Sequence, residues 1–493
     1  MHEQGEQRPG LLRALGPLMA TAVVVGTVIG SGIFKKPQSV ADNVPNFAVV
    51  SLVWILGGVL ALLGAQALTE VAVLFPKAGG NYVFLREGYG RLAGFLWGWV
   101  EFWIIRAASI AALATIFAES LNDIIRNASP DYGLSFWEQR GLTVAIIVSL
   151  AIVNIRGVRW GGGLQLFITL VKVATLLAIM FLPLLLLFGK GATGDGVASA
   201  AAGFAAALPG QIKPVVFTWG GLGTAFLGVL WAYHGWMNLA PMGAEVTNPQ
   251  RTIPIAFLAG VGTIIFLYLG ANLAYHIVIP QAEMAKLTDT TTATEFCRRL
   301  LGPAGAIAAS AAVMCSVFGA VNGNLLVGPR VLYAMGEDRL APKALGAIHP
   351  TYHTPALAIG VVAVWAALLV VLVGAVSYWG LPIFEIGDWI IDLNPPPNKP
   401  PFDILTDYVM FGAVIFETLA VTTIFVFRRT MPDADRPYRC WGYPFVPAIY
   451  LILPAFILCN MFFKQRMEVA VGTGFIALGT LVYWVFLRRE RSD

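Results

Sequence analysis

The chain has 493 residues, of which 57% are hydrophobic and 12% are charged, and its mean hydropathy is +0.73. Soluble globular proteins carry about 25% charged residues, so this composition excludes an ordinary soluble domain and indicates a polytopic protein of the lipid bilayer. The net charge of +4 gives no reason to expect a nucleic-acid partner, and the four cysteines lack the CxxC spacing of a metal site or a disulfide framework. We therefore expect neither a metal nor a cofactor.

Apolar stretches long enough to cross a bilayer recur along the whole chain. At about 20 residues for each span, they predict an all-α membrane protein with about 12 transmembrane helices. No connection between them is long enough to fold as a soluble domain. The expected spans are residues 15–44, 47–75, 92–122, 139–155, 163–188, 220–244, 253–279, 304–334, 355–377, 407–427, 444–463 and 469–487.

The first span contains the sequence GTVIGSGIFKKP, from Gly26 to Pro37. Glycine costs a helix interior roughly 1 kcal/mol relative to alanine, and Ser31 competes for backbone hydrogen bonds, so a break is expected here. A break inside a membrane is tolerated where the freed backbone faces protein or a polar cavity. Freed N–H groups favour a carboxylate and freed carbonyls a cation, and a free amino acid carries both charges. An intact helix that uses Gly30 and Gly32 as packing sites remains the alternative.

The connection at 76–90 is too polar to cross the bilayer, and we expect it to be a cytoplasmic re-entrant or interfacial segment. The third span carries Glu101 and Arg106, and ionisable groups in a membrane usually face the bundle interior or water. Five residues separate them, so they do not stack directly on one face of an α-helix. Glu417 in the tenth span is a candidate partner for Arg106, as a structural pair rather than a substrate contact.

The fifth span has Lys172 near its middle. A bare ammonium is expensive to bury unless it is paired or donates to backbone carbonyls. Lys172 lies too deep for its side chain to reach water easily. We therefore expect it to have a partner inside the bundle.

The sixth span reads LWAYHGWMNLAPMGAEVTNPQRTIP from residue 230 and is interrupted at His234 and Gly235. Two interrupted spans about five helices apart are typical of an inverted-repeat transporter. GSGIF in the first span, with WAYHGW and GAEVTNPQRTIP in the sixth, resembles the amino acid–polyamine–organocation superfamily, and most closely its L-type amino acid transporter branch with bacterial relatives. The likeness extends over nearly the whole chain.

This resemblance implies the five-plus-five inverted repeat of the leucine-transporter fold, with helices 1 and 6 broken. Alternating access would rock spans 1, 2, 6 and 7 against spans 3, 4, 8 and 9. The corresponding division is a cytoplasmic N-tail at 1–14, a first repeat at 15–188, an outer loop at 189–219, a second repeat at 220–427 with an outer insertion at 378–406, helices 11 and 12 at 428–487, and a cytoplasmic C-tail at 488–493.

The resemblance and the helix-end argument together predict a substrate site at the two breaks. The substrate carboxylate should meet N–H groups of the first break, and the ammonium should meet carbonyls of both breaks. Trp231 holds the place where relatives have a large aromatic that covers the bound substrate from outside. The expected substrate-binding residues are Val28, Ile29, Gly30, Ser31, Gly32, Trp231, Ala232, Tyr233, His234 and Gly235, with Trp236 and Asn238 as second-tier candidates.

Four residues are expected to gate or couple transport: Lys172, Trp231, His234 and Glu245. Many sodium-coupled relatives hold sodium between the first and eighth spans, and Lys172 puts a fixed positive charge there, which implies sodium independence. A lysine in such a place can also carry a proton. His234 stands where animal members tend to have glycine, and it either lines the side-chain pocket, titrates near neutral pH or packs as a satisfied histidine. Glu245 at the inner end is expected to gate.

Two later features complete the pattern. Asn322 in the eighth span is expected to make an interhelical hydrogen bond. The insertion at 378–406 carries the acidic residues Glu385, Asp388 and Asp392 and a proline tract at 395–401. The tract favours an extended chain, and the segment suits a lid or a partner contact.

Orientation follows from the basic residues. Of the 32 lysines and arginines, 18 lie on the side of the N-terminus and 10 on the other, which predicts that both termini are cytoplasmic. We expect a plasma-membrane protein, in a bacterial inner membrane. Residues 120–140 contain no cysteine, whereas heavy-chain-linked animal relatives use one there, so no disulfide-linked partner is predicted; a homodimer stays open.

The predicted function is alternating-access transport of an amino acid, as a sodium-independent exchanger of neutral amino acids or with protons. One alternative is a proton-coupled permease for cationic amino acids or polyamines, which needs a carboxylate such as Glu101 or Glu417 in the pocket. A second is an amino acid sensor that binds without transport. An enzyme is not expected, because no nucleophile–base pair or metal cluster appears in the sequence.

Overall fold

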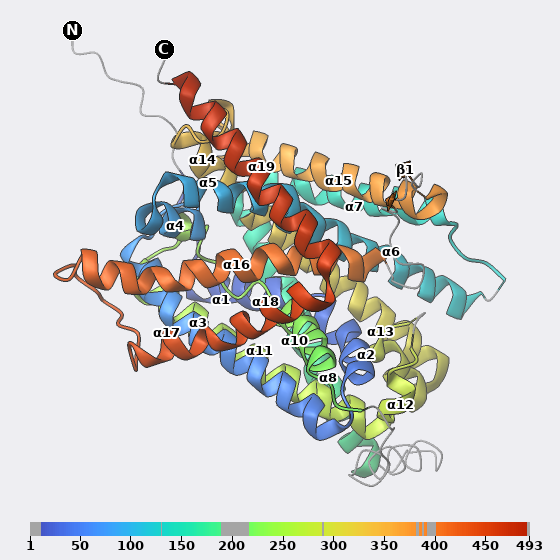
Figure 1. The fold of residues 1–493 in the computed structure, drawn as a ribbon. Helices are drawn as coiled ribbons and strands as arrows, with labels where there is room; N and C mark the ends of the chain where they lie inside the picture. Colours follow the sequence, from blue (N-terminus) through green and yellow to red (C-terminus); the bar gives the residue numbers. More distant parts are fainter. Residues whose placement is uncertain are drawn as a thin grey trace.

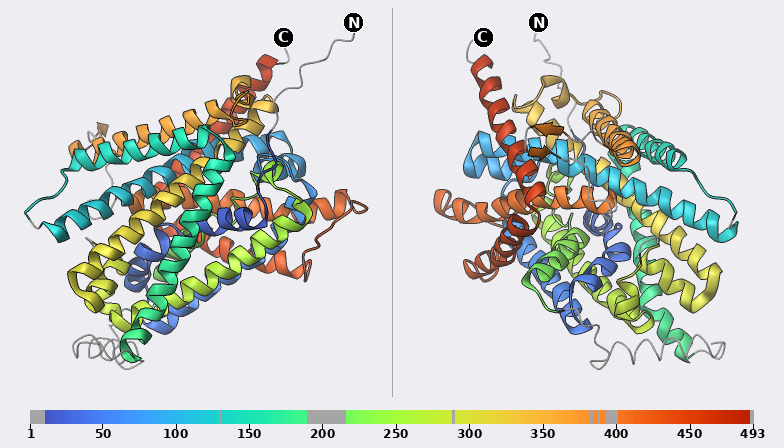
Figure 2. Two further views of the ribbon diagram at one scale, coloured as in Figure 1. Left: turned by 180° about the vertical axis from the view of Figure 1, so that it is seen from behind. Right: turned by 45° about the vertical axis from the view of Figure 1, so that its right-hand side comes forward.

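The computed structural model describes residues 11–129, 131–188, 216–287, 290–380, 384–386, 389–391 and 401–490. They form one bundle of tilted helices (Figures 1 and 2). The helices of the first half are α1 (Pro17–Val28), α2 (Gly32–Asn43), α3 (Phe47–Leu74), α4 (Asn81–Tyr89), α5 (Arg91–Val100), η1 (Glu101–Arg106), α6 (Ala107–Ala128), α7 (Phe136–Ile155) and α8 (Val158–Phe188).

The second half contains two short strands besides its helices. The strands β1 (Phe384–Ile386) and β2 (Trp389–Ile391) pair antiparallel. The helices are α10 (Trp219–Tyr233), η2 (Gly243–Glu245), α11 (Pro249–Val278), α12 (Gln281–Met284), α13 (Thr292–Val327), α14 (Pro329–Glu337), η3 (Lys343–Gly346), α15 (Ala356–Trp379), α16 (Pro401–Thr430), α17 (Phe445–Tyr450), α18 (Ile452–Lys464) and α19 (Arg466–Glu490).

Within the described residues, 11 segments are long and apolar enough to cross a membrane, which confirms a polytopic helical membrane protein. The expected span at 220–244 is not among them because α10 has only 15 residues and the chain then leaves the helix. The predicted insertion contains β1 and β2, and its residues 381–383, 387–388 and 392–400 lie outside the described residues. Residues 189–215 of the expected outer loop lie outside them too.

Both predicted breaks are present, and the two broken segments run in opposite directions. The first helix stops at Val28 and α2 begins at Gly32, whereas α10 ends at Tyr233 and continues as turns into η2. At one end of this pair, Leu15 forms a parallel bridge with Val246. At the other end, α2 packs against α10.

We call one end of the bundle the α4 end, where α4 and α14 lie, and the other the α12 end (Figure 1). The short helix η3 packs against α14. The polar segment at 76–90 does not cross the bundle. Its helix α4 packs against α5, α14 and α16 at the α4 end. Burial raises the pKa of Tyr82 in this helix to about 12, so its hydroxyl stays protonated and donates to Asp338 at 2.7 Å.

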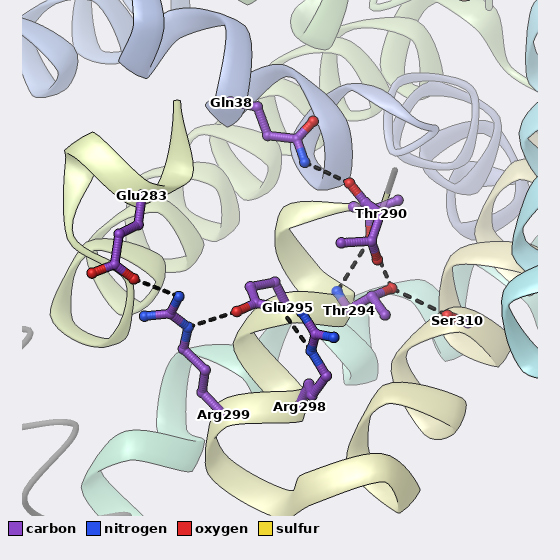
Figure 3. A network of polar contacts seen from close by, with 9 residues as sticks. Gln38, Glu283, Thr290, Thr294, Glu295, Arg298, Arg299 and Ser310 are labelled. Carbon is purple, nitrogen blue, oxygen red and sulfur yellow. Dashed lines mark hydrogen bonds and ion pairs between the residues drawn. The ribbon is translucent and has the colours of Figure 1, made fainter. Parts of the chain in front are cut away.

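The α12 end is tied together by amide and ion-pair contacts between α2, α12 and α13 (Figure 3). Gln38 of α2 donates to the Thr290 carbonyl at 2.6 Å, and Gln281 of α12 donates to the Val44 carbonyl at 2.7 Å. Arg299 bridges Glu295 and Glu283, at 2.8 and 2.7 Å. The two amide contacts hold α2, the second half of the broken helix, to α12 and to the segment before α13, and Arg299 joins α12 to α13.

Candidate functional site

The chain turns between α1 and α2 within three residues. The N–H of Ile29 donates to the Val25 carbonyl at 2.9 Å, and that of Gly30 donates to the Val28 carbonyl at 2.8 Å. Ser31 then begins α2 as its N-cap. The first N–H groups of a helix have no partner within it, and they carry the positive end of the helix dipole. This part of the bundle centre therefore favours an anion.

Two glycines allow the broken segments to approach each other closely. A Cβ at Gly32 would collide with the backbone of Ala232 in α10, so only glycine fits this contact. Gly235 has a φ of +102°, a conformation that L side chains rarely adopt. The glycines of the two motifs thus fix the position of both breaks.

A cavity lies at the two breaks. Of the predicted site residues, Val28, Gly30, Ser31, Gly32, Trp231 and His234 line it, as does the second-tier candidate Asn238. Thr27, Ser109, Leu113 and Asn324 complete its wall. The cavity combines small backbone-exposing residues with hydroxyl and amide groups, so it suits a small polar molecule with hydrogen-bonding groups.

The other predicted binding residues do not line this cavity. The carbonyl of Ile29 accepts from Ser316 of α13 at 3.1 Å, and that of Ala232 accepts from Tyr268 of α11 at 3.1 Å. The hydroxyl of Tyr233 points to the Trp54 carbonyl at 3.4 Å. The carbonyl of Gly235 accepts from Thr27 at 3.2 Å.

Lys172 reaches from α8 to the end of α1 and is fully buried, with 1% of its surface exposed. Its ammonium donates to the carbonyls of Gly26 at 2.7 Å and Ile29 at 2.6 Å. These carbonyls belong to the last turn of α1, where the helix dipole favours a cation. The expectation of an interior partner for Lys172 is confirmed, and the partner is the helix end itself.

Side chains of α10 connect the first broken segment to α16, which contains the expected tenth span. The indole N–H of Trp231 donates to Ser31 Oγ at 3.4 Å, and its ring stacks on His234 at 6.1 Å between centroids and 10° between planes. His234 Nε2 lies 2.9 Å from Glu417 Oε1 of α16. His234 thus connects the cavity wall to a carboxylate outside it.

The candidate pair Arg106–Glu417 is wrong. Residues Glu101–Arg106 form the π-helix η1, in which groups five residues apart come to the same side of the helix. Arg106 therefore pairs with Glu101, with Nε–Oε1 at 2.8 Å, and both are buried. In an α-helix, with 3.6 residues per turn, the side chains of Glu101 and Arg106 would not lie on the same face. Arg106 also donates to Asn324 at 2.5 Å and to Asn238 at 3.3 Å, both in the cavity wall.

Sequence reasoning missed four wall residues: Thr27, Ser109, Leu113 and Asn324. Ser109 and Leu113 are four residues apart in α6, so their side chains lie on one face of that helix. The helix α6 begins directly after η1, which carries the buried pair Glu101–Arg106. The four-residue spacing of Ser109 and Leu113 could therefore have identified this helix face from the sequence. Asn322, by contrast, makes the expected interhelical bonds, accepting from Asn154 at 2.9 Å and donating to Gln165 at 2.9 Å.

Glu245 lies away from the cavity, at the α4 end. Its carboxylate accepts from Arg330 of α14 at 2.8 and 3.1 Å, and both side chains are fully buried. Its carbonyl accepts from the N–H groups of Ala14 and Leu15, at 2.9 and 3.0 Å. Glu245 therefore joins the start of the first broken segment, the end of the second, and α14.

Comparison with known proteins gives similarities over almost the full length of the chain. A family profile described as amino acid permease matches residues 15–487. The serine/threonine exchanger SteT of Bacillus subtilis is 29% identical over 485 residues, covering 98% of this chain and 99% of that protein. The cystine/glutamate transporter of Homo sapiens is 27% identical over 486 residues, covering 98% and 87%. The Asc-type amino acid transporter 1 of Mus musculus is 28% identical over 480 residues, covering 97% and 82%.

Proposed function

Since this chain belongs to the amino acid permease family, and is a membrane transporter of amino acids rather than an enzyme, we propose that it exchanges neutral amino acids without sodium. Exchange is the activity named for the serine/threonine exchanger SteT, to which it is similar over nearly the whole of both chains. The bound substrate would sit in the cavity at the two helix breaks.

The observation that carries this proposal is the cavity at the start of α2, lined by Gly30, Ser31 and Gly32. The N–H groups there would bind the substrate carboxylate, helped by the Ser31 hydroxyl. The substrate ammonium would meet the carbonyls of Trp231 and His234 in the second break. A carbonyl has two lone pairs, so those that already accept one bond retain acceptor capacity. In the first break, the Val28 carbonyl already accepts from Gly30 and Tyr268, and the Ile29 carbonyl from Lys172 and Ser316.

Sodium independence is supported by the position of Lys172. Its ammonium bonds to Gly26 and Ile29, and Ser316 of α13 donates to the same Ile29 carbonyl. A sodium ion requires carbonyl and hydroxyl oxygens, and here a fixed charge already uses them. The lysine would supply the positive charge that a coupling ion supplies elsewhere.

A neutral substrate is supported by the state of the two candidate carboxylates. Neither Glu101 nor Glu417 lines the cavity. Glu101 is paired with Arg106, and Glu417 lies 2.9 Å from His234. A cationic amino acid or a polyamine would need an unpaired carboxylate at the cavity, so this geometry favours an uncharged side chain.

Uptake into proteoliposomes of the purified protein tests the function. Liposomes are preloaded with unlabelled amino acids from a panel, and labelled serine, alanine or leucine is added outside with choline in place of sodium. Exchange predicts uptake that rises with an internal neutral amino acid and is unchanged when sodium is restored. Uptake that needs sodium contradicts the proposal. Uptake that ignores the internal load but follows an inward proton gradient replaces exchange by symport, and binding without uptake replaces it by a sensor.

We also propose that both termini are cytoplasmic, so that the α4 end faces the cytoplasm. The excess of lysine and arginine on that side supports this orientation. The chain would work without a disulfide-linked heavy chain. Labelling of a single cysteine placed at Arg429 or Leu12 by an impermeant reagent in intact cells should fail and should succeed after permeabilisation.

A further inference from the structure

A second cavity lies directly behind the wall of the first. It lies between α3, α10, α16 and the start of α18. Its lining is mainly apolar, from Gly57, Leu60, Leu230, Met410, Val414 and Pro454, and Glu417 is its charged member.

One side chain separates the two cavities. Among the lining residues in the described part of the chain, His234 alone belongs to both. Its ring is held from two sides, by the stacking contact with Trp231 and by the 2.9 Å contact with Glu417. The backbone position is fixed by Gly235, whose φ is +102°. The imidazole is thus held in one position between the two cavities and is not free to rotate.

We propose that His234 is a specificity-determining partition that limits the substrate to small side chains and closes off the apolar cavity behind it. This inference rests on the proposed function, because it assigns the substrate's side-chain direction within the same site. The first cavity favours a small neutral side chain, because Ser109, Asn238 and Asn324 supply polar groups to its wall. The second cavity is a ready-made extension for a larger side chain.

The chemistry of the extension gives a two-step expectation. Without the imidazole, the substrate side chain can enter the apolar cavity, but Glu417 then loses its partner. A buried carboxylate without a partner is costly, so a cationic substrate side chain would replace it. Replacing Glu417 with glutamine removes that charge and leaves an apolar extension. The single variant should therefore gain long cationic side chains, and the double variant should gain large neutral ones.

The experiment compares uptake of serine, phenylalanine and arginine by wild type, His234→Ala and His234→Ala/Glu417→Gln in proteoliposomes. Wild type should favour serine. His234→Ala should raise the ratio of arginine uptake to serine uptake by about tenfold or more. The double variant should raise the ratio of phenylalanine uptake to serine uptake by a similar factor. Val414→Ala enlarges only the second cavity behind an intact partition, so it should keep the wild-type preference.

The outcomes separate this inference from the proposed function. Absence of any amino acid uptake by wild type overturns the function itself. If wild type takes up phenylalanine or arginine as fast as serine, the role proposed for His234 is wrong while the proposed function stands. This outcome is measured on wild type alone. Serine uptake by a folded His234→Ala with an unchanged ratio overturns the role proposed for His234 as well. Should the alanine variant fail to fold, His234→Asn, which keeps a polar group toward Glu417, gives the same comparison with a smaller expected gain.

Discussion

At the scale of single residues, the site depends on buried charges that act on helix ends and on each other. The ammonium of Lys172 compensates the carbonyls that the break of α1 leaves without helical partners. Such charge-assisted hydrogen bonds stabilise by about 1.5–3 kcal/mol each. The break and the lysine therefore depend on one another: the break supplies the acceptors, and the lysine makes their burial tolerable.

Lys172→Met removes the charge and keeps an unbranched side chain. We expect uptake to fall by about tenfold or more, because losing even one such bond misplaces the Gly26 and Ile29 carbonyls beside the site. The size of the effect follows from the energy of the bond, since about 1.4 kcal/mol corresponds to a factor of ten. Initial uptake rates measure it. Lys464→Met, at the end of α18, is the matched control and should transport normally. Full activity of Lys172→Met, or sodium dependence in wild type, would contradict the assigned role.

The pair Glu101–Arg106 is suited to a double-mutant cycle. Both groups are nearly fully buried, so Glu101→Gln or Arg106→Met should each destabilise the protein by about 3–5 kcal/mol by leaving one charge unpaired. The double variant should lose less than the sum. Unfolding in detergent measures these free energies. The exposed pair Arg299–Glu283 is the control, at about 1 kcal/mol or less. Additive losses at Glu101 and Arg106 would show that they do not interact.

At the scale of elements, the fold is arranged around two short helices that stop in the middle of the bundle. Their stopping points follow from glycine placement, since Gly26, Gly30 and Gly32 lie close together in the first span and Gly235 interrupts the sixth. What brings them together is the contact of Gly32 with Ala232, which leaves no space for a side chain. The positive end of α2 and the wall of α10 then share one cavity.

Gly32→Ala tests this contact against a matched glycine. The added methyl group would overlap the Ala232 backbone, and overpacking of this kind costs about 1–3 kcal/mol. We expect lower stability and loss of substrate binding. Gly262→Ala, in α11, meets open space and should be neutral or slightly stabilising, because alanine favours a helix by about 1 kcal/mol. Thermal unfolding and ligand binding check both. Equal effects of the two substitutions would exclude a special role for the α2–α10 contact.

The sequence predicts the elements better than their contacts. The spans, both breaks and the buried partner of Lys172 follow from hydropathy, glycine placement and the cost of a bare charge. The π-helix η1 does not, because its identity depends on hydrogen bonds that composition does not encode. The pairing of His234 with Glu417 joins residues 183 positions apart, so only the packing of α10 against α16 reveals it.

At the scale of the whole molecule, each end of the bundle is held together by its own set of polar contacts. The α4 end has the fully buried pair Glu245–Arg330, which ties both broken segments to α14. The α12 end has amide bonds from Gln38 and Gln281. It also has an ion-pair cluster around Glu295, which Figure 3 draws together with Gln38. Alternating access requires one set to open while the other stays closed.

This arrangement predicts opposite effects of variants at the two ends. Glu245→Gln removes half of a buried ion pair, worth about 3–5 kcal/mol, and should favour the state open at the α4 end. Gln281→Ala removes two neutral hydrogen bonds, worth about 1 kcal/mol each, and should favour the state open at the α12 end more weakly. Reversing a 1:99 population to 99:1 takes about 5.5 kcal/mol, and half of that, about 2.7 kcal/mol, brings the two states to equal populations. The first change exceeds this value and would shift most molecules, whereas the second, about 2 kcal/mol in all, would not.

Thiol labelling of a single cysteine at Ser109, in a chain whose four native cysteines are replaced by serine, measures this shift because Ser109 lines the central cavity. An impermeant maleimide is added from either side of oriented proteoliposomes. Glu245→Gln should label faster from the face of the α4 end, and Gln281→Ala should label moderately faster from the other face. A cysteine at exposed Trp160 should label equally in all variants. If both variants accelerate labelling from the same face, the two ends are not alternative gates, and the buried pair Glu245–Arg330 serves stability alone.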